Sequence, residues 1–456
     1  MAEPAISLNA VEYTLCHLFR VAFPTVDVPF LAELGDQSVI VSLENVQICI
    51  PLMDDAKWET FLSGQLKPIL VDNVSGTLRI PVFRCDNDFD VEICKISDHR
   101  IECFCDLISP AFALLSRYEE FKVYALNLVD WDEHDRIPFN GTLADKYDMV
   151  EIPLADEYAM LLRKWLCQSF PDQFHVVPCK PKVVPTHDID LLYRFETQFQ
   201  SLKSIFGRDL LINRDLKMVW KSIKDFRDWE QDFYQDPYIQ SILEFSKLEK
   251  EAGLEPVFFF KSLVEGDEDV TYDIRDVRML RIWKEIKQNG GNIGLHGSYK
   301  SAGEEGRLRM ERKRLESELG TIQDAVVAGR QHYLRTFFSD DPNSLDLWQQ
   351  AGITDDYTLG FAERCGFRCG TCHPYPLYDV RHDRVTDIIE HPLIVMDGTL
   401  FDYMKLSVED ARTLTQRLKQ RCFDVEGDFV ILWHNHATTR EFEEYYREVY
   451  LPLVSS

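Results

Sequence analysis

The sequence has no surplus of basic residues, and this absence limits the partners that it can bind. Lysine and arginine together number 50, against 77 aspartates and glutamates, so the formal net charge is −27. Such a surface repels phosphate backbones and anionic lipid headgroups. The composition therefore argues against nucleic-acid binding and against docking on anionic membranes, and it leaves the question of catalysis open.

The chain also lacks a long hydrophobic run. Its apolar stretches, such as Pro256–Phe260, are far too short to span a bilayer. Residues Met1–Leu8 carry neither the basic nor the apolar segment of a signal peptide. We therefore expect a cytoplasmic, soluble protein without a membrane span. The 12 cysteines lie in both halves of the chain, and in that compartment they fit reduced thiols better than a disulfide framework.

No internal repeat or low-complexity tract is present, and 456 residues are too many for one typical hydrophobic core. We therefore predict a smaller mixed α/β domain over residues 1–178 and a second domain over residues 179–456, joined at the proline-bounded segment Cys179–Lys182. In the first domain we expect helices at Leu8–Phe23, Pro110–Phe121 and Asp156–Ser169, and strands at Ser38–Leu43, Gln47–Pro51 and Gly76–Val82.

The second domain alternates between β-like and helix-like stretches, which predicts a parallel sheet built of βα units. The expected helices are Tyr272–Gln288, Arg307–Leu319 and Val408–Gln420. The expected strands are Lys182–Thr186, Glu255–Lys261, Asn292–His296, Ala325–Tyr333, Thr354–Gly360, Ile388–Met396 and Asp428–His434. The predicted fold class is therefore α/β, with a closed or distorted seven-stranded (β/α) barrel favoured and a flat doubly wound sheet as the alternative.

The most informative segment is Val183–Asp190, in which an apolar strand leads into two aspartates one residue apart. Residues i and i+2 of a strand point to the same side, so Asp188 and Asp190 share a face at the carboxyl end of the strand, where α/β enzymes place their chemistry. Two carboxylates this close repel each other unless a cation or a shared proton relieves them. The pair predicts a metal site with an adjacent general base, although Asp-x-Asp also occurs in ordinary loops and helix caps.

Three later strands end in residues that such a site needs. His296 ends the third strand among small residues, Arg330 and His332 lie in the fourth, and His434 stands at the tip of the last. In a barrel the catalytic groups come from the carboxyl ends of several strands. A single histidine at a strand end is commonly structural, but several of them after Asp-x-Asp favour one shared site.

The motifs at these strand ends follow in a definite order: Thr186–Asp190, Gly294–Tyr299, Arg330–His332, Asp356–Thr358 and Leu432–His434. In order and spacing, residues 182–454 resemble the polysaccharide deacetylase family, which is carbohydrate esterase family four. The resemblance implies a barrel of the polysaccharide-deacetylase type. It also implies that Asp188 is the general base and that Asp190 binds one divalent metal ion. By the same pattern His296 is a second ligand, Arg330 orients the base, and His434 is the general acid.

The chain departs from that family at one position. The family supplies two metal histidines four residues apart, but the fourth residue after His296 is Lys300, whose positive charge repels a cation. His332 is our candidate for the missing ligand, with His436 or His187 as alternatives. The resemblance favours zinc as the metal, with cobalt, manganese or nickel as alternatives.

The resemblance implies a metal-dependent hydrolase that removes an acetyl group from an N-acetylated sugar of a polysaccharide or its precursor. Candidate contacts for this carbohydrate substrate are Ser298, Tyr299 and Trp433, and Tyr333 and Tyr375 are further aromatic candidates. The first domain resembles an N-terminal domain of uncertain role that accompanies a bacterial subgroup of these proteins, most clearly at residues 115–120.

A rival hypothesis is a non-catalytic carbohydrate-binding relative that keeps the deacetylase fold and has lost full metal ligation. Lys300 favours this alternative. The joint presence of Asp188, Arg330 and His434 speaks against it, because a decayed enzyme tends to lose such groups independently.

Cysteines between residues 365 and 373 suggest other kinds of site. Cys365, Cys369 and Cys372 have the spacing of a radical S-adenosylmethionine cluster, and Cys369, Cys372 and His373 that of c-type haem attachment. The first normally follows the first strand of its barrel and the second needs an exported protein, so we favour neither. A structural zinc site is a further alternative, but we predict three buried free thiols.

Overall fold

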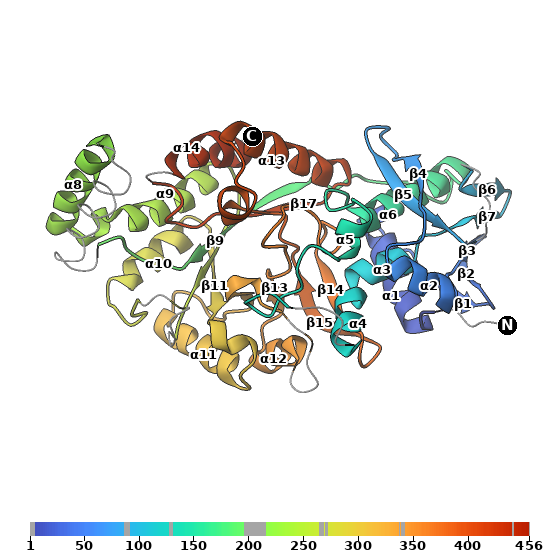
Figure 1. Ribbon diagram of the computed structural model, residues 1–456, viewed down its shortest axis with the longest axis horizontal. Helices are drawn as coiled ribbons and strands as arrows, with labels where there is room; N and C mark the ends of the chain where they lie inside the picture. Colours follow the sequence, from blue (N-terminus) through green and yellow to red (C-terminus); the bar gives the residue numbers. More distant parts are fainter. Residues whose placement is uncertain are drawn as a thin grey trace.

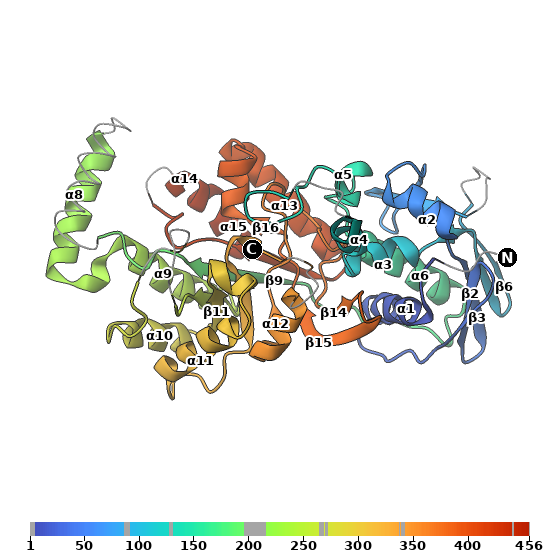
Figure 2. The same ribbon diagram turned by 60° about the horizontal axis from the view of Figure 1, so that its bottom comes forward.

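The computed structural model describes residues 5–85, 92–126, 131–195, 216–263, 269, 272–336, 338, 343–439 and 442–455. The molecule is elongated (Figure 1). A β-rich region made by the N-terminal residues lies at one end, and a large curved sheet flanked by helices fills the centre. Helix α8 (Leu216–Gln231) projects from the opposite end, as the turned view in Figure 2 also shows.

The N-terminal region contains two small sheets, one of strand order β1-β2-β3-β7-β6 and one of order β4-β5-β8. Residues of β2 and β3 alternate between buried and more exposed positions, so one face of the first sheet is turned to the core. The elements are α1 (Leu8–Ala22), β1 (Leu31–Leu34), β2 (Ser38–Leu43), β3 (Val46–Pro51), α2 (Asp55–Leu62), β4 (Ile69–Asp72), β5 (Arg79–Arg84), β6 (Cys94–Ser97), β7 (Arg100–Cys103), β8 (Cys105–Asp106), α3 (Ser109–Leu115), α4 (Tyr118–Leu126), α5 (Leu143–Lys146) and α6 (Leu154–Ser169).

The prediction of one helix over Pro110–Phe121 was wrong, because the chain turns at Arg117 and forms α3 and α4 instead. Arg117 has a left-handed φ of +54°, which a continuous helix does not allow. Its guanidinium links α4 to a distant segment, because Nη1 donates to Glu120 Oε2 at 3.3 Å and to Thr336 Oγ1 at 2.8 Å. A long-range hydrogen bond therefore accompanies the break in the helix.

The helix predicted from Tyr272 begins only at Met279. Before it, the Asp273 and Asp276 side chains accept hydrogen bonds from the backbone N–H groups two residues further on, at 3.0 and 2.9 Å. Such local bonds offer the backbone an alternative to the helix, and this competition explains the later start.

The large sheet has nine strands in the order β14-β15-β13-β12-β11-β10-β9-β17-β16. Neighbouring strands are parallel except for β14 and β15, which are antiparallel. The bounds are β9 (Lys182–Ile189), β10 (Val257–Phe260), β11 (Asn292–Gly297), β12 (Ala328–Gln331), β13 (Asp355–Asp356), β14 (Tyr375–Asp379), β15 (Arg384–Glu390), β16 (Val395–Met396) and β17 (Asp428–Leu432).

The predicted α/β class is confirmed, but the seven-stranded barrel is not. The predicted strand Ile388–Met396 is divided into β15 and β16, which lie near opposite ends of the sheet, and β14 adds an antiparallel edge. Pro392 lies between the two pieces and has no backbone N–H to donate to a neighbouring strand, so a continuous strand is disfavoured there. Within the described ranges no strand pairing joins β14 to β16, so the hydrogen-bonded ladder stays open.

The short link between β15 and β16 nevertheless requires the sheet to curl. Glu390 and Val395 are five residues apart, and an extended chain of that length spans at most about 18 Å. Within the link, Leu393 N donates to Leu359 O at 3.0 Å and Ile394 N donates to Val430 O at 3.1 Å. The two ends of the sheet are thus drawn together around the strands that lie between them.

Helices flank the curved sheet, with α11 and α12 along one side and α13 along the other (Figure 1). Within the described ranges, no helix is both long enough and apolar enough to cross a membrane. The bounds are α9 (Pro237–Glu251), α10 (Met279–Gln288), α11 (Arg307–Leu319), α12 (Ser344–Ala351), α13 (Val408–Asp424), α14 (Glu443–Tyr445) and α15 (Leu451–Val454), with short helical turns at Phe233–Gln235, Tyr299–Ala302, His332–Leu334, Thr399–Tyr403 and Tyr446–Tyr450.

The N-terminal region and the large sheet share one continuous hydrophobic core. Buried polar contacts also cross between them. The Asp156 carboxylate on α6 accepts hydrogen bonds from Thr371 Oγ1 at 2.6 Å and from Cys372 N at 2.8 Å, and Phe367 N donates to Val150 O at 2.7 Å. The predicted domain boundary at residues 178 and 179 falls in the irregular stretch between α6 and β9, and it stays a prediction.

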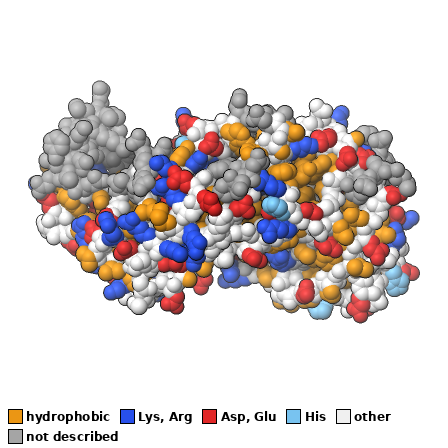
Figure 3. All heavy atoms as spheres, turned by 90° about the horizontal axis from the view of Figure 1, so that it is seen from below, with side chains coloured by type: hydrophobic (Ala, Val, Ile, Leu, Met, Phe, Trp, Pro, Cys, Tyr) orange, Lys and Arg blue, Asp and Glu red, His pale blue; other side chains and the backbone are white. Residues whose placement is uncertain are grey.

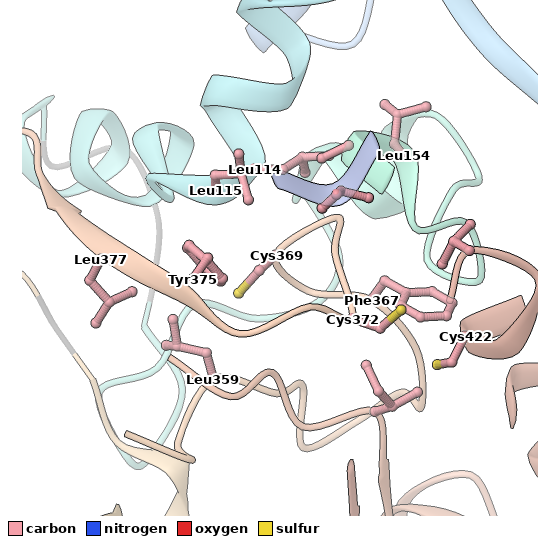
Figure 4. Close-up of a cluster of buried hydrophobic side chains, with 14 of the residues drawn as sticks. Leu114, Leu115, Leu154, Leu359, Phe367, Cys369, Cys372, Tyr375, Leu377 and Cys422 are labelled. Atoms are coloured by element: carbon pink, nitrogen blue, oxygen red, sulfur yellow. The ribbon is translucent and has the colours of Figure 1, made fainter. Parts of the chain in front are cut away.

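The cysteine segment lies inside this shared core. Figure 4 shows Cys369 and Cys372 among Leu114, Phe367 and Tyr375. All the described cysteines are free thiols, and burial raises the pKa of both Cys365 and Cys369 to about 12. Protonated thiols in apolar surroundings are the expected state of structural cysteines, which agrees with the prediction of buried free thiols.

Charged side chains of both signs are intermixed on the face shown in Figure 3. Basic groups lie next to acidic ones over much of that face, although the whole chain carries a formal net charge of −27. The negative excess is therefore not gathered into one continuous acidic field on this side of the molecule.

We predict that Glu120→Ala strongly destabilises the protein. Glu120 holds the buried Arg368 guanidinium through Oε1, at 3.1 Å from Nε and 2.9 Å from Nη2, and so ties α4 to the segment before β14. Removing one partner leaves an uncompensated buried charge, which costs about 3–5 kcal/mol. Urea denaturation measures the loss. Glu409→Ala, which removes an exposed partner of Arg412, is the control and should cost under about 1 kcal/mol. Equal losses for the two variants would refute the assigned role of the buried pair.

We predict that Glu157→Gln stabilises the protein at alkaline pH. Glu157 is 3% exposed. Burial raises its pKa to about 7. The hydrogen bond from Asn73 lowers the pKa, whereas the nearby charge of Asp156 raises it. Between about pH 4.5 and 7 the folded state binds more protons at this site than the unfolded state, so stability falls as the pH rises.

Glutamine does not ionise, so the variant should escape this loss. Between pH 5 and pH 8 the free energy of unfolding of the variant should increase by about 3 kcal/mol relative to that of the wild type, as the pKa difference implies. Urea denaturation at the two pH values makes the comparison, and a constant difference between the proteins would count against it.

Candidate active site

The candidate site lies at the carboxyl ends of the adjacent strands β17, β9, β10, β11 and β12. Parallel strands present their carboxyl ends at one edge, so residues far apart in the sequence meet there. The register explains which residues become neighbours. His296 pairs with Arg330, Leu432 pairs with Thr186, and Phe260 pairs with Ile189. The sheet therefore brings together Asp188, Asp190, His296, Arg330, His332 and His434, as the sequence predicted.

The Asp188 carboxylate is buried and held by Arg330. Arg330 Nη1 donates to Asp188 Oδ1 at 2.9 Å and to Thr186 Oγ1 at 3.0 Å, and its Nε donates to Tyr357 O at 2.8 Å. Burial alone would raise the pKa of Asp188, but the Arg330 guanidinium and then the neighbouring histidines lower it below its usual value. Asp188 is therefore ionised, with Oδ2 turned away from Arg330.

Asp190, His296 and His332 form a cluster that we call the triad. Asp190 Oδ1 lies 3.2 Å from His296 Nε2 and 3.5 Å from His332 Nε2. Donor atoms bound tetrahedrally to zinc at about 2.0–2.2 Å are separated by about 3.3–3.6 Å, so these distances fit such a site. The two histidines and the carboxylate also match the ligand types that zinc prefers.

Both triad histidines are oriented by a hydrogen bond from the opposite ring nitrogen. His296 Nδ1 donates to Arg330 O at 3.0 Å, and His332 Nδ1 donates to Asp269 Oδ1 at 2.8 Å. Such bonds fix the tautomer and turn Nε2 toward a metal in known sites. His296 Nε2 is buried and has no hydrogen-bond partner, and burial lowers the pKa of His332. Both Nε2 atoms therefore lie on the side of Asp190 with a lone pair that can bind a cation.

The ammonium of Lys261 lies beside two residues of the triad. The sequence did not lead us to predict this residue. The register that pairs Phe260 with Ile189 places Lys261 beside Asp190. Its Nζ lies 2.8 Å from Asp190 Oδ1 and donates to His332 Nε2 at 3.2 Å. Burial alone would raise the pKa of Asp190, but Lys261 and then His332 hold it well below its usual range. The available signal was a lysine directly after four apolar strand residues.

His434 is the second cationic group that faces Asp190. Its Nδ1 donates to Asp397 Oδ1 at 2.7 Å, and its Nε2 lies 3.5 Å from Asp190 Oδ2. Burial alone would lower the pKa of His434, but the charge and hydrogen bond of Asp397 raise it to about 9. Asp397 follows β16 and was missed in the sequence, because it lies one residue beyond the predicted strand Ile388–Met396.

The alternatives to His332 do not join the triad. His187 points to the opposite face of β9, where Nδ1 donates to Trp433 O at 2.7 Å and Nε2 lies 2.9 Å from Glu249 Oε1. Lys300 is exposed in the turn after β11. Among the described residues at this edge of the sheet, the group with metal-ligand spacing includes His332 but not His436.

The structure buries two of the predicted substrate contacts, Trp433 and Ser298. Trp433 is fully buried and its Nε1 donates to Ala437 O at 2.9 Å, because it alternates with His434 and points to the opposite side. Ser298 is also buried, and both its N–H and its hydroxyl donate to Glu311. Tyr375, a further aromatic candidate, lies in the core shared with the N-terminal region (Figure 4).

Tyr299 and Tyr333 lie beside the site and contact residues 132–136 of the N-terminal region. The His134 ring lies 4.1 Å from the Tyr333 ring, Arg136 Nη1 donates to Tyr333 O at 2.7 Å, and Arg335 Nε donates to His134 O at 3.0 Å. Tyr333 has a left-handed φ of +59°, a strained conformation that is concentrated at functional sites. The sequence carried no signal for this contribution.

Two matches to known proteins each cover part of the chain. Residues 3–171 match a family model described as a family of unknown function, DUF7033, which covers less than half of the chain. No curated protein matches the chain. Among solved structures, a Mycobacterium smegmatis protein assigned as a polysaccharide deacetylase has 16% sequence identity and a TM-score of 0.36, over 62% of this chain and 89% of that chain. A likeness this low carries no argument about the reaction.

We predict that Asp269→Asn weakens zinc binding at the triad. The substitution replaces the carboxylate that orients His332, and loss of such a partner typically lowers metal affinity about 10–100-fold. Isothermal titration calorimetry with Zn²⁺ measures the change. Asp273→Asn, which alters an exposed aspartate paired with Arg275, should bind zinc like the wild type. Unchanged affinity in Asp269→Asn would show that His332 does not depend on this support.

Proposed function

We propose that the protein is a metal-dependent hydrolase that removes an acetyl group from an N-acetylated sugar of a polysaccharide or its precursor. One observation carries the proposal. An ionised carboxylate, Asp188, and a protonated imidazole, His434, both lie against a triad with zinc-like spacing. Amide hydrolysis needs these three functions together, namely a base, an acid and a site that stabilises the oxyanion.

The triad supplies donors for one divalent ion, for which zinc is our proposal. Asp190, His296 and His332 would hold it, and their distances and orienting hydrogen bonds fit such an ion. When bound, the ion supplies Lewis-acid polarisation of the acetyl carbonyl and lowers the pKa of water. Metal identity stays a proposal.

Asp188 acts as the general base in this proposal. Arg330 occupies Oδ1, so Oδ2 is the oxygen left to accept a proton from water. The guanidinium also keeps the carboxylate ionised before the reaction. Because Arg330 is itself fixed by Tyr357 O and Thr186 Oγ1, the position of the base is set by β9, β12 and the residue that follows β13.

His434 acts as the general acid. Asp397 binds Nδ1 and stabilises the imidazolium, so the proton on Nε2 is available for the departing sugar amine. Nε2 points toward Asp190 Oδ2, on the side where the triad would hold the substrate. Tyr299 and Tyr333 at the side of the site are the aromatic groups that we propose for sugar contact.

The non-catalytic carbohydrate-binding alternative is kept because of one observation, the position of Lys261. Its ammonium lies among the donor atoms and already compensates the charge of Asp190. A protein whose triad is permanently filled in this way would keep the fold and bind sugar without turnover. The proposed partner in both cases is a carbohydrate, with no nucleic acid, and cytoplasmic location stays a prediction.

The test is acetate release from a pentamer of N-acetylglucosamine by zinc-loaded full-length protein. We expect Asp188→Asn and His434→Gln each to lower kcat at least about 100-fold, because each removes one proton-transfer group. Asp387→Asn, an exposed carboxylate on β15, is the control and should keep wild-type activity. Sugar binding by calorimetry without acetate release from the wild type would favour the non-catalytic alternative.

A further inference from the structure

Lys261 uses the same donor atoms that a metal at the triad would use. It follows β10, which lies between β9 and β11 in the sheet, and its side chain is 0% exposed. The ammonium lies 2.8 Å from Asp190 Oδ1 and 3.2 Å from His332 Nε2. Two of the three triad residues are thus already occupied by a cation that belongs to the chain.

An ammonium and a divalent ion cannot share Asp190 without strong repulsion. A lysine ammonium has three donors and no lone pair, so it cannot ligate the ion. A metal bound about 2.1 Å from Asp190 Oδ1 would lie within about 5 Å of Nζ if Lys261 kept its position. Two positive charges at that distance in a buried site repel each other.

A second carboxylate lies next to the ammonium. Asp269 Oδ1 is 3.6 Å from Lys261 Nζ, and the Asp269 side chain is fully buried. A small movement of the flexible lysine side chain away from Asp190 would bring it to Asp269, which already accepts a hydrogen bond from His332 Nδ1. The charge of Lys261 would then stay compensated after Asp190 is taken by another cation.

We propose that Lys261 is a displaceable internal counter-cation, which occupies Asp190 in the metal-free protein and moves toward Asp269 when a divalent ion binds the triad. This inference rests on the proposed use of the triad as a metal site, and it explains what limits the affinity of that site for metal. Every binding event must displace the ammonium, so the wild-type protein binds metal less tightly than its three donors alone would.

The test is Lys261→Met in the full-length protein, because methionine keeps much of the side-chain length and removes the charge. Calorimetric titration with Zn²⁺ at one fixed pH should give a Kd at least about tenfold lower than that of the wild type, since the competing charge is gone. Lys300→Met removes an exposed positive charge near the same edge and is the matched control. Its Kd should stay within about twofold of the wild type.

A second variant covers the case in which Lys261→Met does not fold. Lys261→Gln also removes the charge and keeps a hydrogen-bond donor, and its Kd should fall in the same direction. Zinc should also raise the Tm of either variant more than that of the wild type, because the stabilisation grows with affinity.

The outcomes separate this inference from the proposed function. A wild-type Kd equal to that of the charge-removing variants overturns the inference, because Lys261 would then be a bystander. Failure of all these proteins to bind zinc overturns both the inference and the metal centre. A tenfold tighter Kd in the variants supports the inference even if no sugar loses acetate, since calorimetry does not depend on turnover.

Discussion

Two neighbouring carboxylates at the carboxyl end of β9, the buried Asp188 and the partly buried Asp190, are the constraint around which the candidate site is built. Asp188 and Asp190 leave the same side of the strand and must each be compensated by charge from a neighbouring strand. Arg330 from β12 compensates the first, and Lys261 after β10 and His434 after β17 face the second. The register of the sheet therefore matters chemically, because a slip of one residue would turn other side chains toward the two aspartates.

The sum of the charges in the site also explains why the site suits an added cation. Four carboxylates with direct contacts there (Asp188, Asp190, Asp269 and Asp397) face the cationic groups Lys261, Arg330 and His434. One negative charge is left over among these groups. A divalent ion would change the sum of these charges from −1 to +1. Loss of a proton from a water molecule on the ion would bring the sum to zero, and a metal-bound hydroxide is the state that a hydrolytic metal site needs.

Sequence reasoning predicted the residues at the strand ends but not their full surroundings. Asp188, Asp190, His296, Arg330 and His434 could be predicted because period-two alternation and parallel strands define one edge. Lys261 and Asp397 were missed because their roles depend on register and on the split of one predicted strand into β15 and β16. Trp433 was misplaced although its strand was predicted, because alternation turns it away from His434.

The N-terminal region changes how the site must be understood, because it contributes more than a separate unit at one end. Its core is continuous with that of the large sheet, and residues 132–136 contact Tyr299, Tyr333 and Arg335 beside the triad. Tyr333 directly follows His332, so the strained backbone that places this proposed ligand is held from the N-terminal side by Arg136. Positioning of His332 thus depends on Asp269 through its ring and on the N-terminal region through its backbone. A region that matches a family of unknown function is, on this geometry, part of the support of the candidate active site.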